Sequence, residues 1–87
     1  MRKDHFRSSA GYEIDLVLDF GVRRWAIEFK LTTDPQPQDL ARLNRAADLI
    51  EAEHRFLVSQ VGETVAAGTR VSCNLPWLLG HIETTFA

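Results

Sequence analysis

Apolar and polar residues alternate in two segments of the first third of the chain. Residues 12–20 read YEIDLVLDF and residues 25–31 read WAIEFKL. Both have the period of two and the β-branched and aromatic residues that are typical of strands. Gly21 and Val22 separate them, and glycine at the first central position suits a two-residue type II′ turn. The pattern therefore predicts an antiparallel hairpin.

This turn places Phe20 opposite Arg23 and separates the remaining side chains into two faces. One face is wholly apolar and holds Ile14, Leu16, Leu18, Trp25, Ile27 and Phe29. The other face pairs Glu13 with Lys30, Asp15 with Glu28, Val17 with Ala26, and Asp19 with Arg24. A slip of one residue would mix the two faces, so their separation supports the register.

After Pro35 and Pro37 the pattern becomes helical. Apolar residues recur at helical spacing at Leu40, Leu43, Ala46, Ala47 and Ile50. We predict a helix over 37–52 that covers the apolar face of the hairpin, with Asp39 near its start in agreement with the helix dipole. A strand over 55–60 follows, and because it is joined through a helix it is expected to run parallel to the strand 25–31.

The remaining residues carry weaker signals. Residues 62–68 are expected to form a loop and 69–72 a short edge strand. Asn74 is expected to cap a short helix with Pro76 in its first turn. The fold class is therefore α/β: a mixed sheet with an antiparallel hairpin, a crossover helix and a parallel strand, in a single domain over 1–87.

Composition and charge narrow the class of protein. The formal net charge of -2 excludes a generally basic nucleic-acid coat protein. Cys73 is the only cysteine, so an intrachain disulfide is excluded and a cytoplasmic location is expected. The longest apolar stretch is far shorter than the about 20 residues that cross a bilayer, so no membrane partner is expected.

The polar face of the hairpin holds the candidate chemistry. Asp15 and Glu28 are predicted to lie opposite each other, where directly opposed carboxylates repel. A divalent cation would relieve that repulsion, and Mg²⁺ accepts one or two carboxylates while it keeps waters for a phosphate-bearing substrate. Lys30 lies beside the same point, where it could hold or deprotonate an attacking water or stabilise developing charge.

A structural interpretation of the same residues stays open. Alternating charge is common on the solvent face of a hairpin, and Glu13–Lys30 could be a plain cross-strand ion pair. Basic residues elsewhere either line a phosphate path or form ordinary surface; they are Arg2, Lys3, Arg7, Arg23 and Arg24.

The segments GYEIDLVL at 11–18 and WAIEFKLTT at 25–33 resemble the PD-(D/E)XK nuclease-like superfamily. In that superfamily an Asp on one strand and a Glu-x-Lys on the next form the metal site. The chain is most similar to the C-terminal domain of unknown function of prokaryotic AAA-type ATPases. The matching motifs are FR at 6–7, GYEID at 11–15, AIEFK at 26–30 and DLARL at 39–43.

The resemblance implies catalytic roles for Asp15, Glu28 and Lys30, with Mg²⁺ held by Asp15 and Glu28. Glu13 matches a further acid of the ATPase-associated family. The implied fold is a restriction-endonuclease-like core that lacks its first helix, because few residues precede the first strand. The implied function is metal-dependent phosphodiester hydrolysis on nucleic acid.

The alternative is a catalytically inactive interaction or regulatory C-terminal domain of an AAA-type ATPase. The chain has no Gly-x-x-x-x-Gly-Lys-[Ser/Thr] motif, so an ATPase domain would lie outside it, and the chain is expected to be either a fragment of a larger ATPase or a stand-alone remnant of one. Because the first helix of the superfamily core is lacking, apolar surface and sheet edges stay uncovered. Such surfaces tend to pair with a second copy of the chain, so we predict a homodimer. Alternatively, residues 75–86 fold back over the open face.

Overall fold

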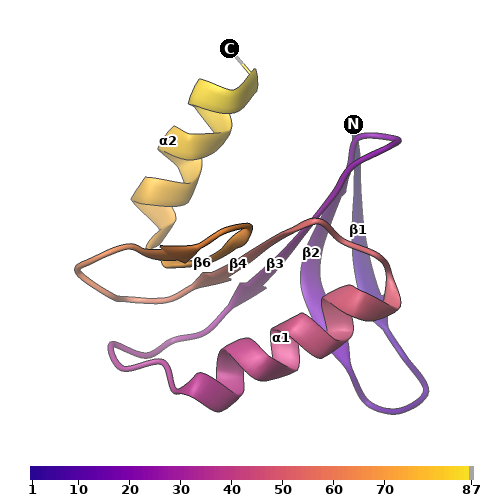
Figure 1. The fold of residues 1–87 in the computed structure, drawn as a ribbon, viewed down its shortest axis with the longest axis horizontal. Helices are drawn as coiled ribbons and strands as arrows, with labels where there is room; N and C mark the ends of the chain where they lie inside the picture. The colour runs from indigo at the N-terminus through magenta and orange to yellow at the C-terminus, as the bar shows by residue number, and fades with distance from the viewer. Residues whose placement is uncertain (87) are drawn as a thin grey trace.

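A six-stranded mixed sheet runs through the centre of the structure, with one helix on each face (Figure 1). The computed structural model describes residues 1–86. The elements in chain order are β1 Arg2–Arg7, β2 Glu13–Asp19, β3 Arg24–Phe29, α1 Pro37–Leu49, β4 His54–Val58, β5 Val65–Ala67, β6 Arg70–Cys73 and α2 Leu75–Phe86. The strand order is β1-β2-β3-β4-β6-β5, in which β3–β4 and β4–β6 are parallel and the other pairs are antiparallel. The α/β fold class is confirmed.

The turn between β2 and β3 has the predicted register. Asp19 pairs with Arg24, and the regular pairing continues as far as Leu16 and Ile27. The N–H of Phe20 donates a hydrogen bond to the carbonyl of Arg23 at 2.8 Å. Gly21 has a φ of 91°, a left-handed conformation that strongly favours glycine.

Beyond Leu16 the register changes because β2 contains a bulge. β1 pairs Asp4 with Val17 and Phe6 with Ile14, so Asp15 and Leu16 together lie opposite one residue of β1. A bulge interrupts the alternation of side chains between the two faces. Ile14 therefore belongs to the same buried cluster as Val17, not to the face of Leu16.

The bulge and the packing of α1 correct two predictions. Ile14 does not share a face with Phe29, whose side chain is 44% exposed. α1 does not cover the apolar face of the hairpin but the face predicted to be polar. Its buried residues pack on the centre of that face, in a cluster of Ile14, Val17, Ala26, Leu43, Ala46, Ala47, Ala52 and Leu57. The small Ala26 and Val17 lie at the middle of this face, so a helix can pack on it while the charged residues lie at its two ends.

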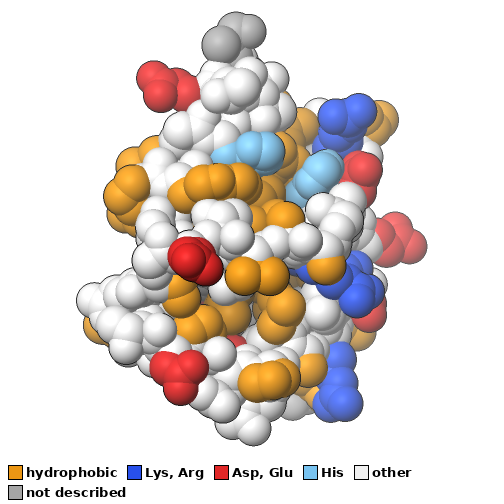
Figure 2. Space-filling view, turned by 60° about the vertical axis from the view of Figure 1, so that its left-hand side comes forward, with side chains coloured by type: hydrophobic (Ala, Val, Ile, Leu, Met, Phe, Trp, Pro, Cys, Tyr) orange, Lys and Arg blue, Asp and Glu red, His pale blue; other side chains and the backbone are white. Residues whose placement is uncertain are grey.

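α2 closes the opposite face, where the bulkier side chains lie. Asn74 Oδ1 accepts the Trp77 N–H at 2.9 Å, as expected of the helix cap, but the helix continues to Phe86. Aromatic rings join it to the sheet: Phe86 stacks on Phe20 with ring centroids 4.5 Å apart, and His81 lies 5.6 Å from Trp25. Figure 2 shows hydrophobic side chains gathered beside α2, next to histidine side chains.

This packing matches the alternative in which residues 75–86 fold back over the sheet. Leu75, Leu79 and Phe86 still present exposed apolar surface, at 45%, 56% and 50%. The homodimer stays a prediction. Within residues 1–86 there is no helix with both the length and the apolar character that a membrane span requires.

The last third of the sheet differs from the predicted edge. β6 is not an edge strand, because it lies between β4 and β5. The edge is β5, within the segment predicted to be a loop, and Gly68 with a φ of 63° turns the chain between β5 and β6. Cys73, at the end of β6, is fully buried beneath α2, and burial raises the pKa of its thiol to about 11.

Candidate functional site

The predicted site residues gather at the carboxyl end of β3, on the face covered by α1. The start of the antiparallel β2 and the end of the parallel β3 lie side by side there, which is the edge where α/β sheets commonly bind ligands. A pocket of about 200 Å³ opens at this point. Its polar lining consists of Tyr12, Glu13, Glu28, Lys30, Asp39 and Arg42.

Asp15 and Glu28 are brought together through the backbone of the neighbouring strand. Glu28 Oε1 accepts the Asp15 N–H at 3.2 Å, and Asp15 Oδ2 accepts the Phe29 N–H at 2.9 Å. These reciprocal bonds replace the ladder bonds that the bulge interrupts. The two side chains therefore lie close together, but they are not the directly opposed ladder pair that the hairpin register predicts.

The ionisation of Glu28 is disfavoured at this position. Burial against α1 is the largest cause, followed by a hydrogen bond to the Asp15 carboxyl group and by the charge of Asp15. Together they raise the pKa of Glu28 to about 8. At neutral pH the pair therefore holds a proton between two acids, which is typical of carboxyl groups in contact.

Lys30 lines the same pocket, but its contact is with a residue of the helix and not with Asp15 or Glu28. Its ammonium group donates to Asp39 Oδ1 in the first turn of α1. The predicted cross-strand pair of Lys30 with Glu13 is absent from the ion pairs of residues 1–86. Lys30 is thus held at the rim of the pocket by a residue of the helix.

Asp39 is the site residue that the sequence analysis did not assign. It also accepts the Gln36 N–H at 2.7 Å, which completes a capping box at the start of α1. The Lys30 hydrogen bond, and after it the Gln36 N–H, hold the pKa of Asp39 below its usual value. Its side chain is only 8% exposed, so this carboxylate anchors both the helix start and the lysine. Its position at the third residue of a helix that follows Glu-x-Lys is the signal that could have identified it.

Glu13 lines the pocket but is neutralised from β1. Its Oε2 lies 3.2 Å from Arg7 and 3.6 Å from His5. Glu13 is therefore a neighbour of the acid pair and not part of it.

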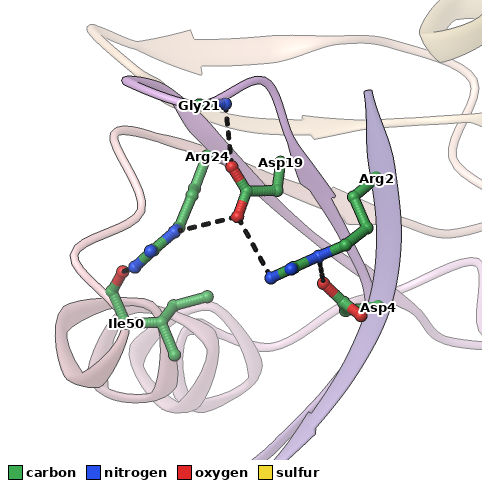
Figure 3. Close-up of polar contacts among 6 residues, drawn as sticks. All are labelled: Arg2, Asp4, Asp19, Gly21, Arg24 and Ile50. Atoms are coloured by element: carbon green, nitrogen blue, oxygen red, sulfur yellow. Dashed lines mark hydrogen bonds and ion pairs between the residues drawn. The ribbon is translucent and has the colours of Figure 1, made fainter.

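The charged residues at the other end of this face form a separate network. Figure 3 shows Arg2 and Arg24 converging on the Asp19 carboxylate, each at 3.5 Å, while the Gly21 N–H donates to it at 2.9 Å. Arg24 also donates to the carbonyl of Ile50 at 2.8 Å, at the end of α1. These arginines are committed to joining β1, the β2–β3 turn and α1, which favours the structural role for them over a phosphate path.

The donor set fits a weakly held Mg²⁺ and not a dedicated metal cage. No group of three or more potential ligands of the histidine, cysteine and carboxylate types gathers within residues 1–86. Asp15 and Glu28 supply two carboxylates, each with one oxygen that the backbone N–H bonds above leave free. That is the number of protein ligands with which Mg²⁺ usually binds beside a phosphate-bearing substrate.

A known family matches nearly the whole chain. The family is described as Domain of unknown function (DUF4143), and it covers residues 2–78. The chain belongs to the DUF4143 family. No curated protein and no solved structure matches the chain.

The DUF4143 match fits the resemblance to a C-terminal domain of AAA-type ATPases. It includes every strand, α1 and all the candidate site residues, and ends within α2. Its description assigns no activity.

Replacing Glu28 with Gln should stabilise the protein at pH 8 and leave its stability almost unchanged below about pH 4, where this carboxyl group is protonated in both the folded and the unfolded chain. An unfolded Glu ionises near pH 4.5, whereas Glu28 in the fold keeps its proton up to about pH 8. Between these values the folded state binds more protons than the unfolded state, so the stability of the wild type falls as pH rises. Gln cannot ionise and escapes this loss. Thermal unfolding followed by circular dichroism should show a difference of several degrees at pH 8. An unaltered pH slope in Glu28→Gln would contradict the assignment, and Glu63→Gln in an exposed loop is the control.

Replacing Asp39 with Asn should lower the free energy of unfolding by about 1 kcal/mol, because it weakens the cap of α1 and removes the partner of Lys30. Urea denaturation measures the change. In a Lys30→Met background the same substitution should cost less, since the ion pair is already gone. Equal losses in both backgrounds would show that the two residues are not coupled.

Proposed function

We propose that this DUF4143 domain hydrolyses phosphodiester bonds of nucleic acid with the help of a divalent cation held by Asp15 and Glu28. The observation that carries the proposal is the closeness of these two carboxyl groups at the carboxyl end of β3. Glu28 also lines the pocket that Lys30 reaches. A role in ion pairs that stabilise the fold would not explain why two acidic side chains lie in contact.

The acid pair is suited to a cation because the proton that it holds takes the role that a bound cation would have. A proton now relieves the repulsion between Asp15 and Glu28, and a divalent cation would relieve it more effectively at neutral pH. When bound, Mg²⁺ supplies Lewis-acid stabilisation of negative charge on a phosphoryl oxygen. The reciprocal N–H bonds hold both carboxyl groups in place before any ligand arrives.

Lys30 stabilises charge at the rim of the same pocket. Asp39 is almost buried, while the lysine side chain is 47% exposed, so the helix holds the ammonium group where a substrate can meet it. A positive charge fixed in advance beside the reacting phosphate lowers the energy of the charge that develops during hydrolysis.

A second candidate function has one observation in its favour. The ammonium group of Lys30 already donates to Asp39, and a nuclease would need part of that capacity for water or phosphate. This favours a non-catalytic regulatory module that serves an AAA-type ATPase outside the chain. In that case the acid pair and the lysine would form a docking surface without chemistry.

Titration calorimetry with Mn²⁺ or Mg²⁺ tests the cation site. The wild type should bind, and at pH 7 should release about one proton per cation, because Glu28 must ionise to become a ligand. The double variant Asp15→Asn with Glu28→Gln should lose at least tenfold in affinity. The matched control replaces Glu63 and Glu83 with Gln and removes two exposed carboxyl groups away from the site. If both doubles bind alike, the acid pair is structural.

Cleavage of labelled single-stranded and duplex oligonucleotides with Mg²⁺ tests the reaction. Lys30→Ala should abolish turnover and leave the calorimetric affinity for Mn²⁺ unchanged, because lysine acts on the substrate and not on the cation. Cleavage that survives in Lys30→Ala would show a contaminant or another site. Cation binding without cleavage in the wild type would favour the regulatory module.

A further inference from the structure

A second pocket adjoins the first and continues it along α1. It has a volume of about 250 Å³ and is lined by Ala10, Gly11, Tyr12, Arg42 and Arg45. Tyr12 and Arg42 line both pockets, so together they form one groove from the acid pair to the turn between β1 and β2. We call this the Tyr12–Arg45 groove.

Arg42 and Arg45 are uncommitted cations. They are three residues apart on the exposed side of α1 and so project in similar directions. Within residues 1–86 neither makes an ion pair or a side-chain hydrogen bond, in contrast to Arg2, Arg7 and Arg24. The charge of Arg42 acts on Asp39, but the main partner of that carboxylate is Lys30.

Two of the acids that line the first pocket already have basic partners. Glu13 is paired with Arg7, and Asp39 is paired with Lys30. The positive charges of Arg42 and Arg45 are therefore left for a ligand in the groove. Tyr12 is half-buried: it packs against the cluster beneath α1 and also lines both pockets.

We propose that Tyr12, Arg42 and Arg45 bind a single strand of nucleic acid, with Arg42 and Arg45 on successive phosphates and the strand leading into the pocket that Glu28 lines. A basic groove with an aromatic side chain is the combination that binds single strands of nucleic acid without preference for their base sequence. Arginine matches the geometry of a phosphate group with two parallel hydrogen bonds. This inference rests on the proposed function for the direction of the strand, but the binding itself needs neither cation nor catalysis.

Fluorescence anisotropy with a labelled twelve-nucleotide oligothymidine, in EDTA, tests the groove. Arg42→Gln with Arg45→Gln should weaken binding at least tenfold at low salt. Because each phosphate contact on a single strand contributes about 0.7 to the slope of log K against log salt, the slope should decrease by about 1.4. The matched control is Arg23→Gln with Arg70→Gln, which removes the same charge from exposed positions at the β2–β3 turn and on β6.

The control double should keep wild-type affinity and slope. Equal weakening in both doubles would overturn the inference, because it would show binding through net charge alone. No binding by the wild type at low salt would overturn it as well. All four arginines are exposed, and matching thermal unfolding curves confirm that the variants are folded.

The two proposals fail in different ways. Loss of cation binding or of cleavage contradicts the proposed function and leaves the EDTA measurement untouched. If the cation binds at the acid pair and the Arg42 and Arg45 double binds the oligonucleotide like the wild type, the groove is wrong while the cation site stands.

Discussion

The bulge in β2 determines where Ile14 and Asp15 lie. It turns Ile14 to the side of α1, where it joins Val17 and Ala26, and it frees the Asp15 N–H from the ladder, so that this group is available to Glu28. Without it, Asp15 and Glu28 would be a plain cross-strand pair on a regular hairpin. The bulge thus completes the cluster beneath α1 and sets the contact of the two acids.

On the face that α1 covers, ion pairs and hydrogen bonds determine how the charged side chains are arranged. The centre of that face holds small apolar residues, and the charged residues lie at its two ends. At one end Asp19 joins two arginines into a structural network; at the other, Asp39 holds Lys30 beside the acid pair. The same helix surface then leaves Arg42 and Arg45 free. One face of the sheet therefore has a network that stabilises the fold at one end and the candidate site at the other.

The sequence predicted the parts of this arrangement that depend on local pattern. The turn at Gly21, the pairing of Leu16 with Ile27 and the crossover helix all follow from alternation and turn chemistry. The register places Asp15 near Glu28, but the way the two side chains meet depends on the bulge. The face covered by α1 could not be predicted in the same way, because both faces of the hairpin bury apolar residues and the bulge leaves no mark in the alternation. The contact of Asp39 with Lys30 was not predicted, because the helix dipole by itself already explains a carboxylate in the first turn of a helix. α2 was predicted as a short helix, because Gly80 and the polar Thr84 and Thr85 weaken the helical signal that aromatic packing restores.

The buried thiol of Cys73 gives the molecule a reporter of its own motions. It lies at the junction of β6 and α2, under the aromatic layer, and its raised pKa keeps it in the unreactive thiol form. A reagent can reach it only when α2 lifts from the sheet or the β4–β6 pair separates. The rate of alkylation of the native chain therefore measures how often the face of the sheet that α2 covers opens, with no engineered label.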